Sequence, residues 1–466
     1  MNIVDRSVNY FCQYGFETVK WDKFDYSILS HIGHDQKRGK HKKSINSVFI
    51  MLDTETSKSK VDEYILKCVN GRMVRDYCEN VNYVVKWSLA INYMGINVVC
   101  VWGSRPTECV KVVETVNNYM SGDITVFYIH NLTYDWQFLR KFFIRQFGEP
   151  VNQINTKPHY PIMIEFENGV QLRDSLILAQ RSLEKWGEDL NVQHQKAVGK
   201  WDYEKIRNQA DEPTNEEIEY FTNDVICGVE CLDRTRKQLR KQHSGMPHTA
   251  TGIVRNEARE TGERYKAHAA YVKTMGDFDW YCAALKCYHG GYTHANRHII
   301  GWVENDVECY DFASSYPYVM VSEKYPCERF KKVDFDLTIT DVLESGYACI
   351  VELYASDIEL KDYFTPMPNL QISKMEYVLN PIVDNGRILK ADFIDIYLTE
   401  IDLEIINNQY KFGNVRIKQC WIAAKDYLPR WFTDYVYRLF KAKTELKGGD
   451  PVQYAIAKSK VNSLYG

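Results

Sequence analysis

Short apolar runs alternate with helical segments through the first half of the chain, and this alternation limits the fold more than any other feature. Three runs have the length and composition of buried strands: SVFIMLD at 47–53, NVVCVW at 97–102 and DITVFYI at 123–129. The clearest helix is expected at 214–242, where Thr214 and Glu217 form a capping box ahead of an apolar stripe. Strands that alternate with helices up to about residue 245 predict an α/β fold class.

The size and composition of the chain indicate a multidomain globular protein. Its 466 residues suit two to four domains, and 45% hydrophobic with 26% charged residues excludes a disordered chain. No apolar run reaches the ~20 residues of a membrane span, and the amino terminus lacks the pattern of a secretory signal. The 13 cysteines include no C-x-x-C pair, so we expect reduced thiols and a cytoplasmic location. The net charge of −4 means that any basic surface for nucleic acid is local.

Two acids follow the first apolar run. In MLDTETS, Asp53 and Glu55 are two residues apart on a strand, so both carboxylates point to the same face. Carboxylates this close repel each other unless a cation lies between them, and oxygen ligands suit Mg²⁺ or Mn²⁺. The D-x-E pattern also occurs elsewhere in the chain, and alone it fits two surface acids equally well.

Two later segments add acids at helical spacing. HNLTYD places Asn131 and Asp135 four residues apart after a buried strand, and YFTND places Tyr220 and Asp224 four apart on the capped helix. Taken singly, Asn131 could cap a helix and Asp224 could be a solvated acid. Together, three acidic elements and a phenol match two-metal phosphodiester cleavage, in which carboxylates hold the ions and a hydroxyl orients the attacking water.

The order of these motifs resembles that of a known family. D-x-E, N-x-x-x-D and Y-x-x-x-D follow one another as in the 3′–5′ proofreading exonucleases with the ribonuclease-H-like fold. The resemblance implies two Mg²⁺ or Mn²⁺ ions in the site. It also implies four metal-binding acids and a water-orienting tyrosine: Asp53, Glu55, Asp135, Asp224 and Tyr220.

The same resemblance implies a surface for the frayed 3′ end of single-stranded DNA. Its expected contacts, the last two from a DSL segment, are Thr56, His130, Asn131, Tyr134, Phe138, Ser175 and Leu176. A lysine near the third motif is expected to contact the scissile phosphate, and Lys196 and Lys200 both fit this role.

The second half of the chain carries a further acid followed by a ring. In YDFASSYPYVM, Asp311 is expected at the end of the strand VECYDF (307–312), five residues before Tyr316. The string alone also fits a strand end and a turn. It resembles D-x-x-S-L-Y-P, the first polymerase motif of family B DNA polymerases, with Ser315 in place of leucine. The resemblance implies that Asp311 binds two catalytic metal ions and that Tyr316 excludes a ribose 2′-hydroxyl.

The last nine residues, KSKVNSLYG, are expected to be helical. In a helix, Lys458, Asn462 and Tyr465 share one face, and a charge, an amide and a ring on one face suit a nucleotide. The segment resembles K-x-x-x-N-S-x-Y-G, the second polymerase motif of the same family. The contacts that this implies are Lys447 and Lys458 for the phosphates of an incoming dNTP, Asn462 and Tyr465 for the nascent base pair, and Gly466 for the template.

Between the two halves, YHGGYTHAN resembles the Y-x-G-G motif that links the exonuclease and polymerase domains. The resemblance implies that Tyr288, Gly290 and Gly291 contact template DNA. Two adjacent glycines allow a close approach of the backbone or a positive φ, and a plain loop is the alternative.

The residues after Asp311 resemble one branch of family B. MPNLQISK and ADFIDIYLTEIDLEIINNQY are similar to the protein-primed polymerases of phages and linear plasmids, in which an insertion here contacts the terminal protein that supplies the priming hydroxyl. The expected order is an N-terminal extension, a ribonuclease-H-like exonuclease domain, a linker with the start of the palm, the insertion with more of the palm, and helical fingers. The corresponding ranges are 1–45, 46–245, 246–322, 323–426 and 427–466.

The expected polymerase set is incomplete. Family members continue after the second motif into a hairpin that bears D-x-D, whereas D-x-D occurs here at Asp277/Asp279 and Asp334/Asp336, ahead of that motif. We expect a fragment of a longer protein, or one half of a split polymerase whose second chain brings the remaining palm and the thumb. The leading hypothesis is a DNA-directed, protein-primed DNA polymerase with 3′–5′ proofreading, acting on primer–template DNA and dNTPs in the cytoplasm of a phage host. A stand-alone 3′–5′ exonuclease and a non-catalytic partner of DNA or of a polymerase subunit are the alternatives.

Overall fold

The structure, a computed structural model, describes most of the chain as two compact units. It describes residues 16–33, 35–37, 43–69, 72–196, 201–202, 205–449 and 451–464; for 35–37, 59–69, 72–81, 268, 451–453 and 455–456 it describes the backbone alone. The first unit runs to Val254 and includes Leu446–Leu464, and the second is Arg255–Glu445. The five segments expected from the sequence are finer than this division, and their boundaries remain predictions. In the described ranges no helix is long and apolar enough to cross a membrane.

The first unit is built on an eight-stranded mixed sheet. In sheet order its strands are β1 (Glu17–Lys20), β6 (Ile96–Gly103), β5 (Arg72–Tyr93), β4 (Phe49–Val69), β7 (Thr125–Ile129), β10 (Val170–Asp174), β9 (Tyr160–Glu165) and β8 (Asn152–Lys157). The pairs β1–β6, β4–β7 and β7–β10 are parallel, and the other pairs are antiparallel. A short hairpin of β2 (Asp35–Lys37) and β3 (Ser44–Asn46) precedes β4.

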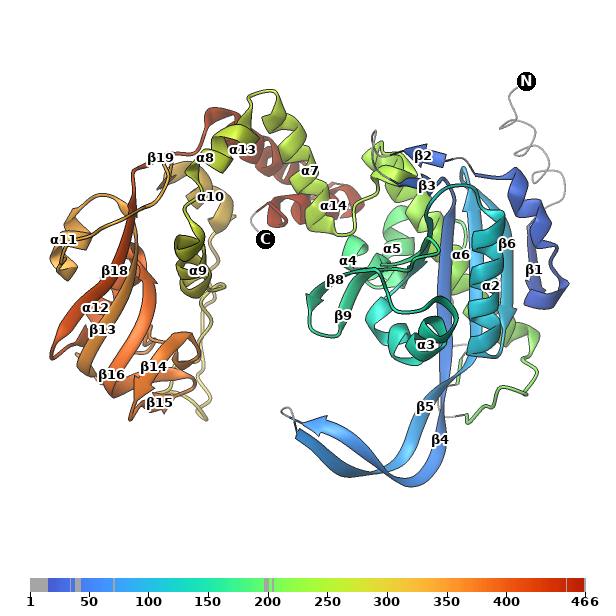
Figure 1. Cartoon of the computed structure of the whole chain (residues 1–466), viewed down its shortest axis with the longest axis horizontal. Helices are drawn as coiled ribbons and strands as arrows, with labels where there is room; N and C mark the ends of the chain where they lie inside the picture. The colour runs from blue at the N-terminus through green and yellow to red at the C-terminus, as the bar shows by residue number, and fades with distance from the viewer. Residues whose placement is uncertain are drawn as a thin grey trace. The chain divides into compact units, whose positions relative to one another are not determined.

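Helices cover both faces of this sheet (Figure 1). On one face lie α2 (Pro106–Tyr119) and α3 (Leu132–Phe147), and on the other lie α4 (Ser175–Ala179), α5 (Leu183–Leu190) and α6 (Asn215–Leu239). Leu52 and Phe127 belong to the core under α2 and α3, whereas Met51 and Val126 belong to the core under α5 and α6. Neighbouring residues of one strand therefore serve opposite cores, as the pleat of a strand requires. The helix α14 (Pro451–Asn462) contacts α5.

The three apolar runs and the capped helix are confirmed as strands β4, β6 and β7 and helix α6. The capping box is present at the start of α6: the Glu217 N–H donates to the Thr214 hydroxyl at 3.2 Å, and the Thr214 N–H donates to the Glu217 carboxylate at 3.0 Å. The stripe that contains Val225, Val229 and Leu232 is fully buried against the sheet. Local pattern and tertiary packing thus agree along this helix.

Two features of the sheet are not apparent from the sequence. Residues 17–20, which lie inside the predicted N-terminal extension, add the edge strand β1 by pairing in parallel with β6, for example Thr18 with Cys100. The strands β4 and β5 contain 21 and 22 residues, and their far halves leave the sheet as a two-stranded hairpin (Figure 1). Such strands are several times longer than the usual 5–6 residues.

The second unit is built on an antiparallel sheet. Its strands are β12 (Lys331–Lys332), β18 (Val415–Ala423), β13 (Ala348–Leu360), β16 (Arg387–Thr399) and β14 (Met375–Leu379), with β15 (Ile382–Asp384) beside β16 and β17 (Tyr410–Lys411) beside β13. The helix α12 (Glu400–Gln409) packs on the face that carries Val351 and Leu353, and α11 (Ile339–Glu344) contacts α12. The helix α9 (Phe278–Cys287) packs on the other face, beside Ile350 and Trp421.

The remaining elements of the chain are mostly helices. They are α7 (Ala250–Glu263), α8 (Ala267–Thr274), α10 (Ser315–Ser322) and α13 (Arg430–Glu445), with a two-stranded pair of β11 (Lys324–Pro326) and β19 (Lys425–Tyr427). The segment 427–466, which is expected to be helical, contains α13 and α14, with Gly448 at a φ of 86° between them.

One predicted strand is wrong. VECYDF (307–312) forms no helix or strand, and every residue from Gly301 to Ala313 is exposed. A strand needs a neighbour to pair its backbone N–H and C=O groups, and no described strand lies beside this segment. An apolar-looking hexapeptide without such a neighbour stays irregular.

Candidate functional site

Three of the predicted metal-binding acids come together at the junction of β4 and α6. Carboxylate oxygens of Asp53, Glu55 and Asp224 all lie within 4.8 Å of one another. The alternation of β4 aims Asp53 and Glu55 at the face covered by α6, where Asp224 is 4% exposed. The alternative interpretation of Asp224 as a solvated helix acid is therefore wrong.

The fourth acid, Asp135, approaches from α3. It is 3% exposed, and the Thr54 hydroxyl donates to its Oδ1 at 2.5 Å. Asp135 is not within ligand distance of all three other acids, but it is close enough for its charge to raise the pKa of Asp53. Thr54 lies between Asp53 and Glu55 in sequence and points to the opposite face, so one tripeptide serves acids on both sides of the strand.

The start of α3 is held by a residue that the sequence analysis did not single out for this role. Asn131 is the N-cap residue at a φ of 77°, but its side chain accepts no capping hydrogen bond. Instead, the carboxylate of Asp174 accepts the backbone N–H groups of Leu132 at 3.1 Å and Asn131 at 3.3 Å. Asp174 ends β10, which pairs with β7, so a carboxylate from the neighbouring strand orients the helix that carries Asp135.

Burial raises the pKa values of all four acids, and repulsion by the other acids adds to this for Asp53 and Glu55. Burial, then the charge of Asp224, raises the pKa of Glu55 to about 8. Burial raises the pKa of Asp135 to about 7 against the hydrogen bond from Thr54. Burial also raises the pKa of Asp224, and burial followed by the charges of Asp135 and Glu55 raises the pKa of Asp53 well above its ordinary value. Negative charge in this site is therefore costly without a cation.

The acids fit a divalent cation of the Mg²⁺ or Mn²⁺ kind. All the nearby ligand groups are carboxylates, which hard cations prefer, and histidine and cysteine are absent from the group. The buried Oδ1 of Asp224 has no hydrogen-bond partner among the described residues. An unpaired carboxylate oxygen facing two further carboxylates is an environment that a cation would complete.

Of the two candidate lysines, Lys196 lies at the site. Its ammonium group is 2.5 Å from Asp224 Oδ2. Burial opposes the charge of Lys196, but the nearby carboxylates of Asp224 and Asp53 raise its pKa. Lys200 lies outside the described residues.

Tyr220 lies one helical turn before Asp224 and is 4% exposed. Its ring stacks on Trp201, with ring centroids 5.7 Å apart and planes 21° from parallel. Trp201 is in turn covered by the guanidinium of Arg207, at 3.9 Å from the ring centroid. Trp201 and Arg207 were not among the predicted residues, because their position depends on how the loop before α6 folds back.

A second group of predicted residues forms a small aromatic surface. The hydroxyls of Thr56 and Tyr134 are 2.9 Å apart, and Phe138 meets the Tyr134 ring edge to face at 5.2 Å. The Tyr134 side chain is 40% exposed. Thr56 follows Glu55 directly on β4, so this surface begins at the acidic site.

A third group lies where β7 and β10 end. The His130 Nδ1 and the Ser175 hydroxyl are 3.1 Å apart, and the His130 ring stacks on Trp186 at 6.0 Å. Burial lowers the pKa of His130 to about 4, so this imidazole is neutral near pH 7. Leu176 is partly exposed beside Ser175. The parallel pairing of β7 with β10 explains why 130 and 175 meet.

The predicted metal-binding acid of the second unit is exposed, unlike the acids of the first unit. Asp311 is exposed in the irregular segment, and it belongs to no described group of three potential metal ligands. Two contacts do connect this region to other predicted residues. A Cβ on Gly291 would lie 3.0 Å from the Tyr316 hydroxyl, and the Lys443 ammonium is 2.5 Å from the Ser314 hydroxyl. A side chain at position 291 would therefore require the Tyr316 hydroxyl to shift by a few tenths of an ångström.

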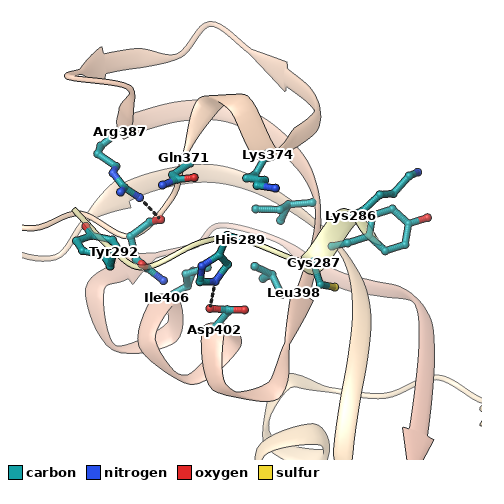
Figure 2. A pocket seen from close by; sticks show the side chains of 13 residues that line it. Lys286, Cys287, His289, Tyr292, Gln371, Lys374, Arg387, Leu398, Asp402 and Ile406 are labelled. Atoms are coloured by element: carbon teal, nitrogen blue, oxygen red, sulfur yellow. Dashed lines mark hydrogen bonds and ion pairs between the residues drawn. The ribbon is translucent and has the colours of Figure 1, made fainter. Parts of the chain in front are cut away.

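Figure 2 shows a pocket beside the Tyr288–Gly291 segment that is lined by several cationic side chains. The Lys374 ammonium donates to the Tyr288 carbonyl at 2.5 Å, and His289 Nε2 lies 3.1 Å from Asp402. Arg387 is 5% exposed; its guanidinium covers the Tyr292 ring at 4.2 Å and makes no described ion pair. This pocket has the charge to accept an anion.

Only some of the residues predicted to bind the nucleotide are among those that the structure describes. Lys458 and Asn462 are exposed and four residues apart on α14, and Lys447 is exposed in the turn before it. Tyr465 and Gly466 lie outside the described residues. Lys447, Lys458 and Asn462 belong to the first unit. Asp311 and Tyr316 belong to the second unit, so the nucleotide site remains a prediction.

Comparison with protein families adds an independent finding. Residues 278–466 match the family described as DNA polymerase type B, organellar and viral. The DNA polymerase of Bacillus phage Nf is 24% identical over 392 residues, which cover 76% of this chain and 62% of the phage protein. The DNA polymerase of Bacillus phage B103 is 25% identical over 284 residues, covering 58% of this chain and 43% of the phage protein. The chain thus spans less than two thirds of the length of these relatives.

Solved structures agree on the fold. Phi29 DNA polymerase in complex with primer-template DNA and incoming nucleotides superimposes with a TM-score of 0.64 and 19% identity, over 90% of this chain and 68% of that chain. The same enzyme with single-stranded DNA gives a TM-score of 0.63 over 90% of this chain. The mixed α/β fold is therefore that of the phi29 polymerase over most of the chain. Residues 278–466 therefore resemble the DNA polymerases of type B, organellar and viral, and the phage polymerases are similar to a larger part of the chain.

Proposed function

We propose that this protein is a DNA-directed, protein-primed DNA polymerase that proofreads with a 3′–5′ exonuclease, and that the chain carries the full exonuclease set and part of the polymerase set. One observation carries the proposal. Three carboxylates with raised pKa values, a fourth nearby, and a lysine on one of them are grouped in a homologue of phage DNA polymerases. Such a group is costly to the fold and is explained by metal-dependent chemistry.

In this proposal Asp53, Glu55, Asp135 and Asp224 hold two Mg²⁺ or Mn²⁺ ions. When bound, the ions supply charge stabilisation to the phosphate and lower the pKa of a bound water. The water oxygen bonds to phosphorus while the bond from phosphorus to the 3′ oxygen breaks, and the leaving oxygen takes up a proton. Tyr220 orients the water through its hydroxyl, and Lys196 stabilises negative charge on the phosphate.

The strand to be shortened would lie on the two surfaces beside the acids. Thr56, Tyr134 and Phe138 offer a hydroxyl and a ring edge to the last bases and sugars, since aromatic rings stack on bases without sequence preference. His130, Asn131, Ser175 and Leu176 would contact the backbone and the preceding base. A neutral His130 suits this role as a hydrogen-bond partner rather than as a charge.

Polymerisation would use Asp311 for metal binding, Tyr316 for sugar selection, and Lys447, Lys458, Asn462 and Tyr465 for the nucleotide. Tyr288, Gly290 and Gly291 would contact the template, with Gly466 beside it, and the cations of the neighbouring pocket suit its phosphates. The sheet within 323–426 would contact the terminal protein that supplies the priming hydroxyl.

A second candidate function is a 3′–5′ DNA exonuclease that does not polymerise, either alone or as a subunit of a split polymerase. The observation that favours it is that Asp311 is exposed and belongs to no group of three potential metal ligands among the described residues. Nucleotidyl transfer by two metal ions needs more than one carboxylate.

The test is one assay on the purified chain. A labelled primer–template is incubated with Mg²⁺, with and without dNTPs. Shortening without nucleotides and extension with them supports the polymerase proposal. Shortening under both conditions supports the second candidate. No shortening at all contradicts the exonuclease in either form.

A further inference from the structure

The surroundings of Tyr220 contain a layered arrangement that the chemistry above does not use. The indole of Trp201 stacks on the phenol ring of Tyr220 and also contacts the guanidinium of Arg207. All three side chains are nearly inaccessible, at 5%, 4% and 5% exposed. A stack of this kind, buried from end to end, leaves the middle ring very little freedom.

Arg207 is the fixed end of this stack. Its Nη2 and Nε donate to the Glu217 carboxylate at 2.9 and 3.2 Å, and its Nη1 donates to the Asp202 carbonyl at 2.6 Å. Its backbone N–H donates to the Ser57 hydroxyl at 2.9 Å. Ser57 lies on β4, two residues beyond Glu55. One arginine therefore ties the strand that carries Asp53 and Glu55 to the first turn of the helix that carries Tyr220.

The loop around Arg207 is itself held to the sheet. The Tyr83 hydroxyl donates to the Arg207 carbonyl at 2.5 Å, and Gln209 donates to the Val84 carbonyl at 2.9 Å. The buried Lys86 donates to the Asp211 carbonyl at 2.6 Å. Three contacts with β5 thus keep the loop in place while the site binds and releases its substrate.

We propose that Trp201, clamped by Arg207, is a positioning residue that fixes the direction of the Tyr220 hydroxyl for the attack of water in the exonuclease reaction. This inference rests on the proposed function. A tyrosine on a helix chooses between staggered rotamers, and only one of them can hold its hydroxyl at the reacting water. Stacking removes the alternatives before substrate arrives, which lowers the cost of reaching the reactive geometry.

The stack predicts an energetic coupling between Trp201 and Tyr220. Tyr220→Phe keeps the ring and removes the hydroxyl, and Trp201→Ala removes the ring that aims it. If Trp201 acts through that hydroxyl, its removal matters only while the hydroxyl is present. The two effects on kcat are then strongly non-additive, whereas two independent contributions would multiply.

The experiment measures kcat and KM for digestion of a labelled single-stranded oligonucleotide with Mg²⁺ by the full chain. We expect Trp201→Ala and Tyr220→Phe each to lower kcat by about 10- to 100-fold with KM within twofold. The double variant should be no slower than Tyr220→Phe alone. Trp201→Phe, which keeps an aromatic layer, should retain most of the activity.

Arg207→Lys sharpens the test because lysine keeps the charge opposite Glu217 but loses the planar stack. We expect an intermediate loss of kcat that also disappears in the Tyr220→Phe background. Multiplicative losses in the double variants, or a change confined to KM, would overturn the inference. If Trp201→Ala does not fold, as judged by circular dichroism, the Trp201→Phe and Arg207→Lys pairs decide the question. A parent chain that digests nothing would instead contradict the proposed function.

Discussion

The sequence places Asp53 and Asp311 in the same situation, each at the end of an apolar run and each at the head of a motif, but the structure treats them differently. Asp53 lies on β4, is paired with Ser88 of β5, and meets two other acids within 4.8 Å. Asp311 lies in an irregular, exposed segment with no described strand beside it. The two motifs are equally clear in the sequence, but only the motif at Asp53 lies on a strand of a sheet.

The difference teaches where the geometry of a metal site comes from. A strand that is paired in a sheet fixes the direction of every second side chain, because its backbone hydrogen bonds set the register. Asp53 and Glu55 take their alignment from their pairing with Ser88 and Lys86 of β5. Asp311 carries the same carboxylate in a segment that forms no strand.

Removing two acids of the site at Asp53 should abolish digestion. The pair Asp53→Asn and Asp135→Asn leaves no complete set of cation ligands, and we expect the rate of single-strand digestion to fall by roughly 1,000-fold or more. Gel electrophoresis of a labelled oligonucleotide measures the rate. Glu216→Gln, an exposed acid in the first turn of α6, is the matched control and should digest at the parent rate. Digestion at the parent rate by the double variant would show that the site is elsewhere.

Lys196 should matter more than Lys200. Lys196 forms the ion pair with Asp224, and removing it leaves a charge on the phosphate uncompensated. We expect Lys196→Ala to lower the digestion rate by about 10- to 100-fold, and Lys200→Ala to have a smaller effect. Gel electrophoresis of a labelled oligonucleotide measures the digestion rate of both lysine variants. The reverse order would assign the phosphate contact to Lys200.

The acids of the site at Asp53 should destabilise the metal-free protein as pH rises. The pKa of Glu55 is about 8 in the fold, above its value of about 4.3 in an unfolded chain. The folded state therefore holds a proton that the unfolded state has lost, and stability falls across this interval. Glu55→Gln removes the titration. We expect equal melting temperatures of the variant and the parent near pH 4 and a higher melting temperature of the variant at pH 8. The free energy of unfolding of the variant should then exceed that of the parent by on the order of a few kcal/mol.

Thermal melts in EDTA between pH 4 and 9 measure this difference, with Glu216→Gln, which keeps Glu55, as the control that should lose stability over this range as the parent does. Added Mg²⁺ should reduce the difference at pH 8, because the cation stabilises the parent by binding. A difference that stays constant with pH would contradict the raised pKa of Glu55.

A substitution that disturbs the exposed segment 301–313 should lower the stability of the protein only slightly. Lys443 contacts Ser314, and we expect Lys443→Ala to lower stability by about 1 kcal/mol or less. Limited proteolysis should cut between 301 and 313 faster in the variant, with the strands around Asp53 untouched. A large loss of stability would mean that the segment is a structural part of its unit, and the contrast with Asp53 would fail.

Much of the first unit was predictable from local pattern. The helix α6 combines a capping box, an apolar stripe and a basic end, and the three apolar runs have the length and composition of buried strands. The grouping of Asp53 with Glu55 follows from the two-residue period of a strand. These features depend on residues close together in sequence, which is why they can be read there.

The parts that could not be predicted depend on distant partners. The four residues of β1 form a strand only because β6, some eighty residues later, offers its edge. The choice of Lys196 over Lys200 and the stack of Trp201 on Tyr220 depend on the path of the loop before α6. The strand predicted at 307–312 does not form, because an apolar segment needs a neighbouring strand to become one.

Glu217 closes the capping box with Thr214 and also accepts Arg207. In evolutionary terms, this shared carboxylate links residues that would otherwise drift separately. Replacing Glu217 removes one of the two capping-box hydrogen bonds and leaves a buried guanidinium without its carboxylate in one step. Positions 207 and 217 should therefore be exchanged together in lineages of this protein, whereas the Thr214 hydroxyl caps a backbone N–H that any residue at 217 keeps.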